Sequence, residues 1–208
     1  MSRRFLILGI GNLLWADEGF GVRCVEHLNE HFDCPPQVQL LDGGTQGLYL
    51  VQHVQQCDVL IVFDAVDYGL PPGTMKIVRD DEVPKFMGAK KMSLHQTGFQ
   101  EVLATAEFAG GYPEELLLIG VQPEALEDFG GSLREVVRAQ IGPAVAVALA
   151  FMAERGVVLT PRADCDVPEL SPSQLAIREY EQGRPAAADA CRIGDSRFMP
   201  LAAEQEPG

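Results

Sequence analysis

Five acidic side chains lie where three apolar segments of this sequence end. They are Asp17, Glu18, Asp42, Asp64 and Asp67. Carboxylates that gather without a partner repel one another, so at least one of them would have to stay protonated. A bound cation removes that conflict. The residue types and their positions therefore indicate a site for a divalent metal ion.

A histidine further along the chain can add a nitrogen ligand to these oxygens. His95 lies in the sequence Ser-Leu-His-Gln at 93–96, which matches a capping box and predicts that His95 is in the first turn of a helix. The positive end of a helix lowers the pKa of an imidazole, which keeps the ring neutral and able to bind metal. Two carboxylates and one imidazole with open positions suit nickel, zinc or manganese.

Each candidate ligand also has a structural interpretation. Glu18 can be an acid favoured by the dipole at the start of a helix, and Asp42 can form the turn before Gly43 and Gly44. A histidine at a helix end needs no metal. Asp64 is the hardest to explain in this way, because an acid directly after a buried strand needs a partner.

The turn after the first apolar segment differs from a nucleotide-binding loop. Its sequence, GIGNLLWADEG at 9–19, has Leu14 where the G-x-G-x-x-G fingerprint needs its third glycine. Asp17 and Glu18 also lie where a pyrophosphate would need positive potential. This end of the predicted first strand is therefore suited to a cation rather than to a nucleotide.

Apolar segments alternate with helical patterns along most of the chain. Strands are predicted at 5–10, 38–41, 59–63 and 116–121, with a further strand in a hairpin or at a sheet edge at 75–78. Helices are predicted at 22–32, 48–54, 93–108 and 133–154. The pattern predicts an α/β fold, a three-layer sandwich in which a twisted, mostly parallel sheet of about five strands has helices on both faces. Right-handed crossovers would bring the acids together at the carboxyl edge of this sheet.

The composition limits the partners of the protein. A formal charge of −14 argues against nucleic acid and anionic membranes as partners, because Lys- and Arg-rich surfaces bind both. The longest apolar run, 144–152, is too short to span a bilayer. The sequence shows no signal peptide before the first strand, and its five cysteines form no C-x-x-C pair. We expect a cytoplasmic protein and a monomer.

The character of the sequence changes near residue 161. Residues 1–160 predict one α/β domain with a complete hydrophobic core. Residues 161–208 are rich in alanine, proline and charge, with one short helical candidate at 173–181. This segment cannot bury enough apolar area for a core of its own. We expect a C-terminal extension, either an extended arm or partly disordered, rather than a second domain.

Six motifs, in order along the chain, resemble those of the maturation endopeptidases of nickel–iron hydrogenases. They are GIGNLLWADEGFGVR at 9–23, LLDGGTQG at 40–47, FDAVDYG at 63–69, PGTM at 72–75, SLHQTG at 93–98 and LIGVQPE at 118–124. The resemblance implies an α/β sandwich fold and a protease that removes the C-terminal peptide of the hydrogenase large-subunit precursor after nickel insertion. The long C-terminal extension is similar to that of members serving membrane-bound uptake hydrogenases.

The resemblance also implies how the substrate is recognised. Glu18, Asp64 and His95 match the family's nickel ligands, and the nickel is implied to arrive within the substrate, with zinc as a substitute metal. These are residues to which the argument from strand ends also leads. The implied partner is the large-subunit precursor.

The sequence lacks the motifs of the common protease classes. It has no G-x-S-x-G elbow, no H-E-x-x-H helix and no active-site cysteine signature. We therefore expect hydrolysis through metal polarisation or a carboxylate-activated water, as in an aspartic-type endopeptidase. Asp42, beside a glycine-rich loop, is the candidate general base.

Two other functions share some of these features. A non-catalytic, nickel-binding chaperone of hydrogenase assembly would show the same metal ligands. A receiver domain also gathers acids at strand ends, but it needs a lysine at the end of a late strand, where this chain reads Gly-Val-Gln-Pro at 120–123. Cleavage of the precursor, as opposed to binding alone, separates the protease from the chaperone.

Overall fold

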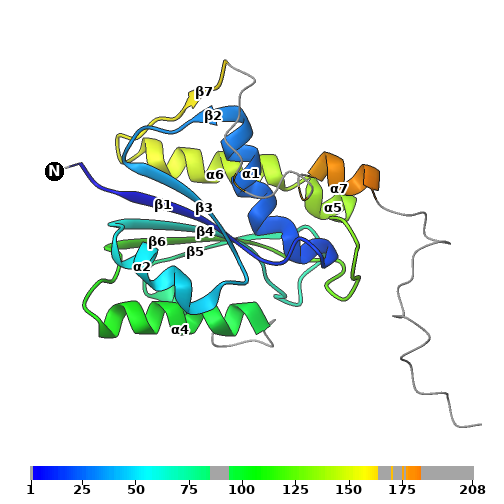
Figure 1. The fold of residues 1–208 in the computed structure, drawn as a ribbon, viewed down its shortest axis with the longest axis horizontal. Helices are drawn as coiled ribbons and strands as arrows, with labels where there is room; N and C mark the ends of the chain where they lie inside the picture. Colours follow the sequence, from blue (N-terminus) through cyan, green and yellow to red (C-terminus); the bar gives the residue numbers. More distant parts are fainter. Residues whose placement is uncertain (1, 85–93, 164–169, 171–174, 176, 184–208) are drawn as a thin grey trace, which may run out of the picture.

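A five-stranded sheet forms the centre of the computed structural model, which describes residues 2–84, 94–163, 170, 175 and 177–183, without the side chains of 94–98. The strand order is β3-β1-β4-β6-β5 (Figure 1). The strands are β1 (Phe5–Ile10), β3 (Val38–Gly44), β4 (Val59–Ala65), β5 (Met75–Arg79) and β6 (Glu115–Val121). The strands β3, β1, β4 and β6 are parallel to one another, and β5 lies antiparallel to β6 at the edge. The predicted mostly parallel sheet and the edge position of 75–78 are confirmed.

Helices cover both faces of the sheet (Figure 1). One face carries α1 (Phe20–His31) and α6 (Ile141–Ala153), and the other carries α2 (Val51–Gln55) and α4 (Leu94–Phe108). The shorter elements are η1 (Ala16–Gly19), β2 (Phe32–Asp33), η2 (Gly47–Leu50), α5 (Glu135–Arg138), β7 (Thr160–Pro161) and α7 (Ile177–Gly183). The three-layer α/β sandwich expected from the alternating pattern is confirmed.

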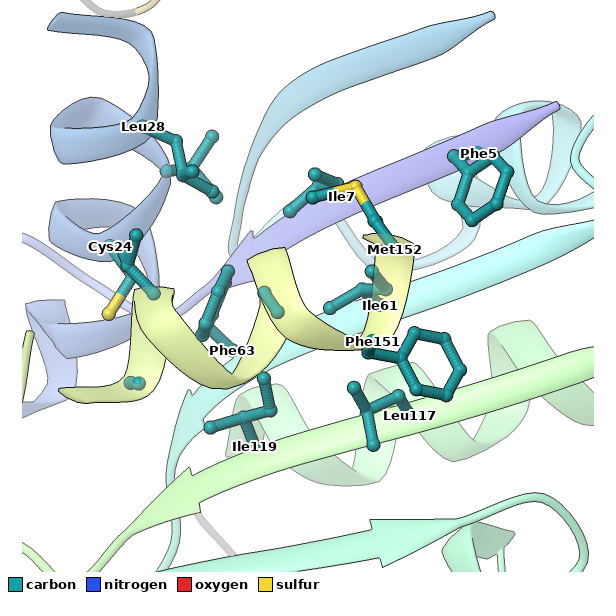
Figure 2. Packing of buried hydrophobic residues seen from close by; sticks show 14 of the residues in the cluster. Phe5, Ile7, Cys24, Leu28, Ile61, Phe63, Leu117, Ile119, Phe151 and Met152 are labelled. Atoms are coloured by element: carbon teal, nitrogen blue, oxygen red, sulfur yellow. The ribbon is translucent and has the colours of Figure 1, made fainter. Parts of the chain in front are cut away.

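The hydrophobic core has one half on each face of the sheet, because successive strand residues point to opposite sides. Ile7, Ile61 and Phe63 pack against α1 and α6, as Figure 2 shows. Leu60 and Val62, their neighbours on β4, pack toward α2 and α4. Each such buried side chain stabilises the fold by about 1.5–3 kcal/mol through removal of apolar area from water. This alternation also fixes the face on which each acid at a strand end lies.

The structure differs from the sequence prediction at 133–154, where one long helix was expected. The structure has two helices there, α5 and α6, separated at Ala139 and Gln140. Pro143 explains the break, because proline has no N–H to donate to a carbonyl one turn earlier and is accommodated in the first turn of a new helix. Phe32 was predicted to belong to the first helix, but it lies after α1 in β2, which pairs with β7.

The segment Glu135–Ala153 is the one helical stretch, among the described residues, that is long and apolar enough to cross a membrane by length and composition. Its buried residues Phe151 and Met152 pack against strands of the central sheet (Figure 2), and Ala148 belongs to the same buried cluster. Such packing is that of a core helix of an α/β domain.

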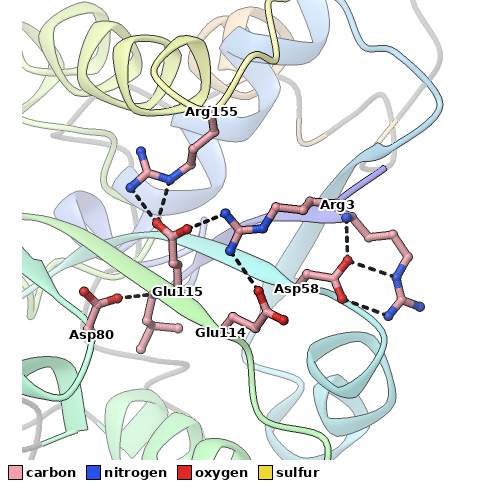
Figure 3. A network of polar contacts seen from close by, with 8 residues as sticks. Arg3, Asp58, Asp80, Glu114, Glu115 and Arg155 are labelled. Carbon is pink, nitrogen blue, oxygen red and sulfur yellow. Dashed lines mark hydrogen bonds and ion pairs between the residues drawn. The ribbon is translucent and has the colours of Figure 1, made fainter. Parts of the chain in front are cut away.

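Arginines meet the acids at the amino end of the sheet (Figure 3). Glu115 accepts hydrogen bonds from Arg155, with a distance of 2.6 Å from Nε, and from Arg3. Asp58 accepts from the backbone N–H of Arg4 at 2.7 Å and from its guanidinium at 3.2 Å. These hydrogen bonds lower the pKa of Asp58. Burial opposes the same effect on Glu115, but the two arginines outweigh it and lower the pKa of Glu115.

The described part of the C-terminal extension packs on the α/β domain. Glu181 of α7 pairs with Arg138 and accepts a hydrogen bond from Ser132. Arg23, a buried side chain of α1, donates to the carbonyl of Leu175 at 2.6 Å. The extension therefore contacts the domain on the side of α1 and α5, and the boundary at residue 160 remains a prediction.

Candidate active site at the carboxyl end of the sheet

Asp64 lies near the end of β4, the central strand of the sheet. Its side chain is only 3% exposed. Since Phe63 and Ala65 face α1 and α6, Asp64 faces the other side, where α4 packs. Its register partner on β6 is Gly120. A carboxylate as buried as this one needs donors or a positive charge around it.

Asp42 lies in β3, on the other side of β1, and its register partner is Gly9. Leu40, two residues earlier, packs with the α1 side of the core, so Asp42 lies on that face. The pKa of Glu26, on α1, is raised first by burial and also by the nearby charge of Asp42. Asp42 accepts a hydrogen bond from the N–H of Gly44 at 2.9 Å. Asp42 and Asp64 therefore flank β1 on opposite faces of the sheet.

Glu18 lies in η1, the turn of helix between β1 and α1, and is half-buried. The backbone of Glu18 lies directly over the end of β1. A Cβ atom on Gly11 would be 1.7 Å from the carbonyl oxygen of Glu18, and Gly11 has φ +134°, so only glycine is accommodated there. The glycine-rich turn of the sequence thus allows a close backbone approach and holds an acid at the strand end.

His95 is the second residue of α4, so the predicted helical position of this residue agrees with the structure. Its side chain lies outside the described residues, as does Ser93, the predicted capping residue. Phe99, one turn further on, lines a small hollow with Ile10 and Gly44, which places the start of α4 at the carboxyl end of the sheet. The backbone of His95 and the side chain of Asp64 therefore lie on the same face.

The acids whose side chains are described do not form a metal site by themselves. Within that part of the chain, no three His, Cys, Asp or Glu side chains converge closely enough to hold an ion. A three-ligand site built on Glu18 and Asp64 therefore requires a further donor, the role that the sequence prediction gives to His95.

Asp17 has a structural role that the sequence did not indicate. This side chain is fully buried, and its carboxylate accepts hydrogen bonds from three backbone N–H groups: those of Glu124 and Ala125 at 2.8 Å each, and that of Arg134 at 2.7 Å. Its own N–H donates to the carbonyl of Ala125 at 3.1 Å. The residue before Glu18 thus fixes η1 to the loop that follows β6.

Gln122 is a second residue whose role sequence reasoning missed. Its side chain is 6% exposed, and its carbonyl oxygen accepts from the N–H groups of Tyr68 at 2.7 Å and Leu70 at 3.1 Å. Its amide donates to Asp67 at 3.0 Å and to the carbonyl of Pro123 at 3.3 Å. A glutamine directly after a buried strand is the only sequence signal, and it identifies a buried polar group without identifying its partners.

Tyr68 folds back over β6 beside Asp64. A Cβ atom on Gly120 would be 1.8 Å from the Tyr68 hydroxyl oxygen, so the ring end rests on the backbone of the strand. Burial raises the pKa of the Tyr68 hydroxyl, and the nearby negative charge of Asp64 raises it further. The loop after β4 is therefore packed closely against the strand that neighbours Asp64.

Several known proteins are similar to this chain in sequence and in fold. A family model for hydrogenase maturation proteases matches residues 22–151. The hydrogenase expression/formation protein HupM of Azotobacter chroococcum is 71% identical over 198 residues, which cover 95% of this chain and 94% of HupM. The structure of the hydrogenase maturating endopeptidase HybD of Escherichia coli superposes with a TM-score of 0.73 at 44% identity, and covers 77% of this chain and 99% of HybD.

These matches cover different shares of the chain. The match to HybD leaves about a quarter of this chain uncovered, whereas the match to HupM covers nearly all of it. The family model, HupM and HybD agree on one relationship, and the resemblance that the six motifs carry is confirmed. The chain belongs to the hydrogenase maturation protease family, whose members are endopeptidases.

Proposed function

We propose that this endopeptidase removes the C-terminal peptide of a hydrogenase large-subunit precursor after nickel insertion, and that it recognises the bound nickel. Membership of the family supports processing of the large subunit. One observation of the structure supports recognition of the metal: Asp64, a carboxylate 3% exposed, lies at the end of the central strand on the face where α4 begins.

The donor set fits nickel carried by the substrate. Glu18 and Asp64 would supply carboxylate oxygens, and His95 an imidazole nitrogen, a combination that borderline divalent ions accept. Zinc in the same position would meet the same donors. A cation there would also offset the cost of burying Asp64 as an anion. The three residues come from η1, β4 and α4, so recognition would depend on how the fold holds these elements together.

Hydrolysis requires a second role, which we assign to Asp42. Its carboxylate would take a proton from a water molecule as that water attacks the carbonyl carbon of the scissile peptide bond, and would return the proton to the leaving amine nitrogen as the C–N bond breaks. The N–H of Gly44 orients this carboxylate at 2.9 Å. Asp42 and Asp64 lie on opposite faces of the sheet with β1 between them, so a peptide that reaches both carboxylates would have to cross the carboxyl end of β1.

The described cysteines support a proposal for the cellular setting. The described cysteines Cys24, Cys34 and Cys57 are free thiols, as is usual in a reducing compartment. We therefore assign the reaction to the cytoplasm and treat the enzyme as a monomer. The known endopeptidases among the structural neighbours favour the protease over the nickel-binding chaperone.

Incubation with precursor tests the proposal. The purified chain is mixed with nickel-loaded or nickel-free large-subunit precursor, and shortening of the precursor is followed by mass spectrometry. We expect shortening of the nickel-loaded form alone. Equal shortening of both forms would contradict nickel recognition, and a stable complex without shortening would identify a chaperone.

Substitution of Asp42 separates catalysis from recognition in the same assay. Asp42→Ala should lose cleavage and keep a preference for binding nickel-loaded precursor. Loss of that preference, with cleavage rate falling in proportion, would move Asp42 from the catalytic step to metal recognition.

A further inference from the structure

One short segment contacts both the loop that follows Asp64 and the turn that carries Glu18. Residues 122–125, which follow β6 directly and are called the brace segment below, contact the loop after Asp64 through Gln122 and the turn before Glu18 through Asp17. We propose that this brace segment sets the position of Glu18 relative to Asp64, with Asp17 and Gln122 as positioning residues. The proposal rests on the proposed role of Glu18 and Asp64 in recognising nickel.

The contact on the Asp64 side is made by a side chain. The Gln122 carbonyl oxygen accepts from the N–H groups of Tyr68 and Leu70, and its amide donates to Asp67. The backbone adds to this, since the N–H of Gly73 donates to the carbonyl of Gln122 at 2.8 Å. The loop that leaves β4 is thus held at several points to the end of β6, only a few residues after Asp64.

The contact on the Glu18 side is made by the backbone of the brace segment. The N–H groups of Glu124 and Ala125 both donate to one carboxylate oxygen of Asp17, and the Asp17 N–H returns a hydrogen bond to Ala125. Trp15 adds an edge-to-face contact with Phe129, at 5.4 Å between ring centroids. Because Asp17 precedes Glu18 directly, displacement of Asp17 moves Glu18.

The two contacts lie close together along the chain and are shielded from water. Gln122 and Ala125 are three residues apart, a separation of at most about 11 Å along an extended chain. Asp17 is fully buried and Gln122 is 6% exposed, so water competes little for their hydrogen bonds. Neither side chain needs to touch the metal. Their effect on recognition would come from the ligands that they hold in place, as for residues that support metal ligands in general.

Two variants remove these contacts at nearly constant shape. Gln122→Met deletes the acceptor and donor of the glutamine. Asp17→Asn replaces a carboxylate oxygen by an amide NH₂, which cannot accept from the backbone N–H that it faces. The measured quantity is the ratio of the Kd for nickel-free precursor to the Kd for nickel-loaded precursor. A loss of stability alone leaves this ratio unchanged, because it affects binding of both forms equally.

We expect each variant to reduce this ratio by about 10-fold or more, the effect usual for residues that support a metal ligand. Asp58→Asn is the matched control. Asp58 also accepts a backbone N–H at 2.7 Å, but at the amino end of the sheet. This control should lower the thermal unfolding midpoint and keep the wild-type ratio. Wild-type ratios in both Gln122→Met and Asp17→Asn would overturn the proposal.

The same measurements separate this proposal from the proposed function. A Kd ratio near one for the wild-type protein would refute nickel recognition itself. An unchanged ratio in Glu18→Ala and Asp64→Ala would refute it as well. A ratio lost in those two variants but kept in the brace variants would refute only the positioning role. Loss of the ratio in the Asp58→Asn control as well would show that the ratio responds to substitutions far from the site, and would also overturn the positioning role.

Discussion

The acidic side chains at the two ends of the central sheet have different kinds of hydrogen-bond partner. At the amino end, Glu115 and Asp58 are met by arginine side chains (Figure 3). At the carboxyl end, Asp17 is met by three backbone N–H groups, and Asp67 accepts from the amide of Gln122. The same residue types therefore occur in two electrostatic settings within one sheet.

The difference shows what each end is suited to. A guanidinium neutralises a carboxylate and ties two elements together, so the amino end gains stability from its acids. Backbone and amide donors carry no net charge, so they orient an acid while its negative charge persists. The three backbone N–H groups around Asp17 therefore orient its carboxylate without neutralising it. Substitutions at the carboxyl end should lower activity and substitutions at the amino end should lower stability, which tests this contrast.

The largest contrast is expected between Asp64→Asn and Glu115→Gln. Asp64→Asn removes a proposed nickel ligand and should reduce cleavage of nickel-loaded precursor by more than about 100-fold, the upper end of the effect of residues that only support ligands. Glu115→Gln should keep the wild-type rate and lower the free energy of unfolding by about 1 kcal/mol, since its ion pairs are partly exposed. Cleavage rates and urea titrations measure both. Wild-type cleavage by Asp64→Asn would remove the distinction between the ends.

The same substitution at two glycines gives the next contrast. Gly120→Ala places a methyl group against the Tyr68 hydroxyl, within 1.8 Å before relaxation, and should cost about 1–3 kcal/mol of unfolding free energy. Gly142→Ala lies in α6 with open space around it, and should raise the unfolding free energy by about 0.5–1 kcal/mol. Cleavage should fall only in Gly120→Ala. Equal stability of the two variants would show that the Tyr68 loop gives way easily.

Removal of the extension should have a smaller effect on the domain. A chain that ends at Ala163 keeps β7 but loses the contacts of Glu181 with Arg138 and of Leu175 with Arg23. We expect a folded protein whose unfolding free energy is lower by about 1–2 kcal/mol, the loss of a few partly exposed polar contacts. Circular dichroism and thermal unfolding measure this. An unfolded product would show that the extension belongs to the core and that the domain boundary is wrong.

The pH dependence of stability should originate mainly at the amino end. The pKa of Asp58 is lowered by Arg4, and the pKa of Glu115 is lowered by Arg155 and Arg3 against the effect of burial. A lowered pKa stabilises the fold above the unfolded-state value, near 4, and this stabilisation is lost as the pH falls through the folded-state value. Asp58→Asn should therefore reduce the loss of unfolding free energy as the pH falls below the unfolded-state pKa, near 4. An unchanged acid transition would contradict this source.

Local pattern predicted the sheet and most helices because strands such as 59–63 are apolar throughout and helices recur between them. Elements whose limits depend on partners were less predictable. Asp64 was expected to end its strand, yet β4 continues to Ala65 because β6 pairs with it to that point. Pro143 broke a helix that apolar periodicity alone extends.

The candidate site was predictable in its residue types and less so in its geometry. Strand ends and helix starts can be located from sequence, so the positions of Glu18, Asp42 and Asp64 at one edge follow from the topology. The face of each side chain depends on the exact strand phase, and this phase places Asp42 and Asp64 on opposite faces. The positioning roles of Asp17 and Gln122 arise from contacts across more than 50 residues of sequence, which no local pattern encodes.

The claim that the carboxyl end recognises nickel is tested most directly by X-ray absorption at the nickel edge. The nickel-loaded precursor is measured alone, with the cleavage-deficient Asp42→Ala enzyme, and with an enzyme that carries Asp64→Ala in addition. The account predicts new oxygen or nitrogen neighbours at about 2.0–2.2 Å from nickel in the first complex, and fewer of them in the second. An absorption spectrum of nickel that stays unchanged when a stable complex forms would contradict it.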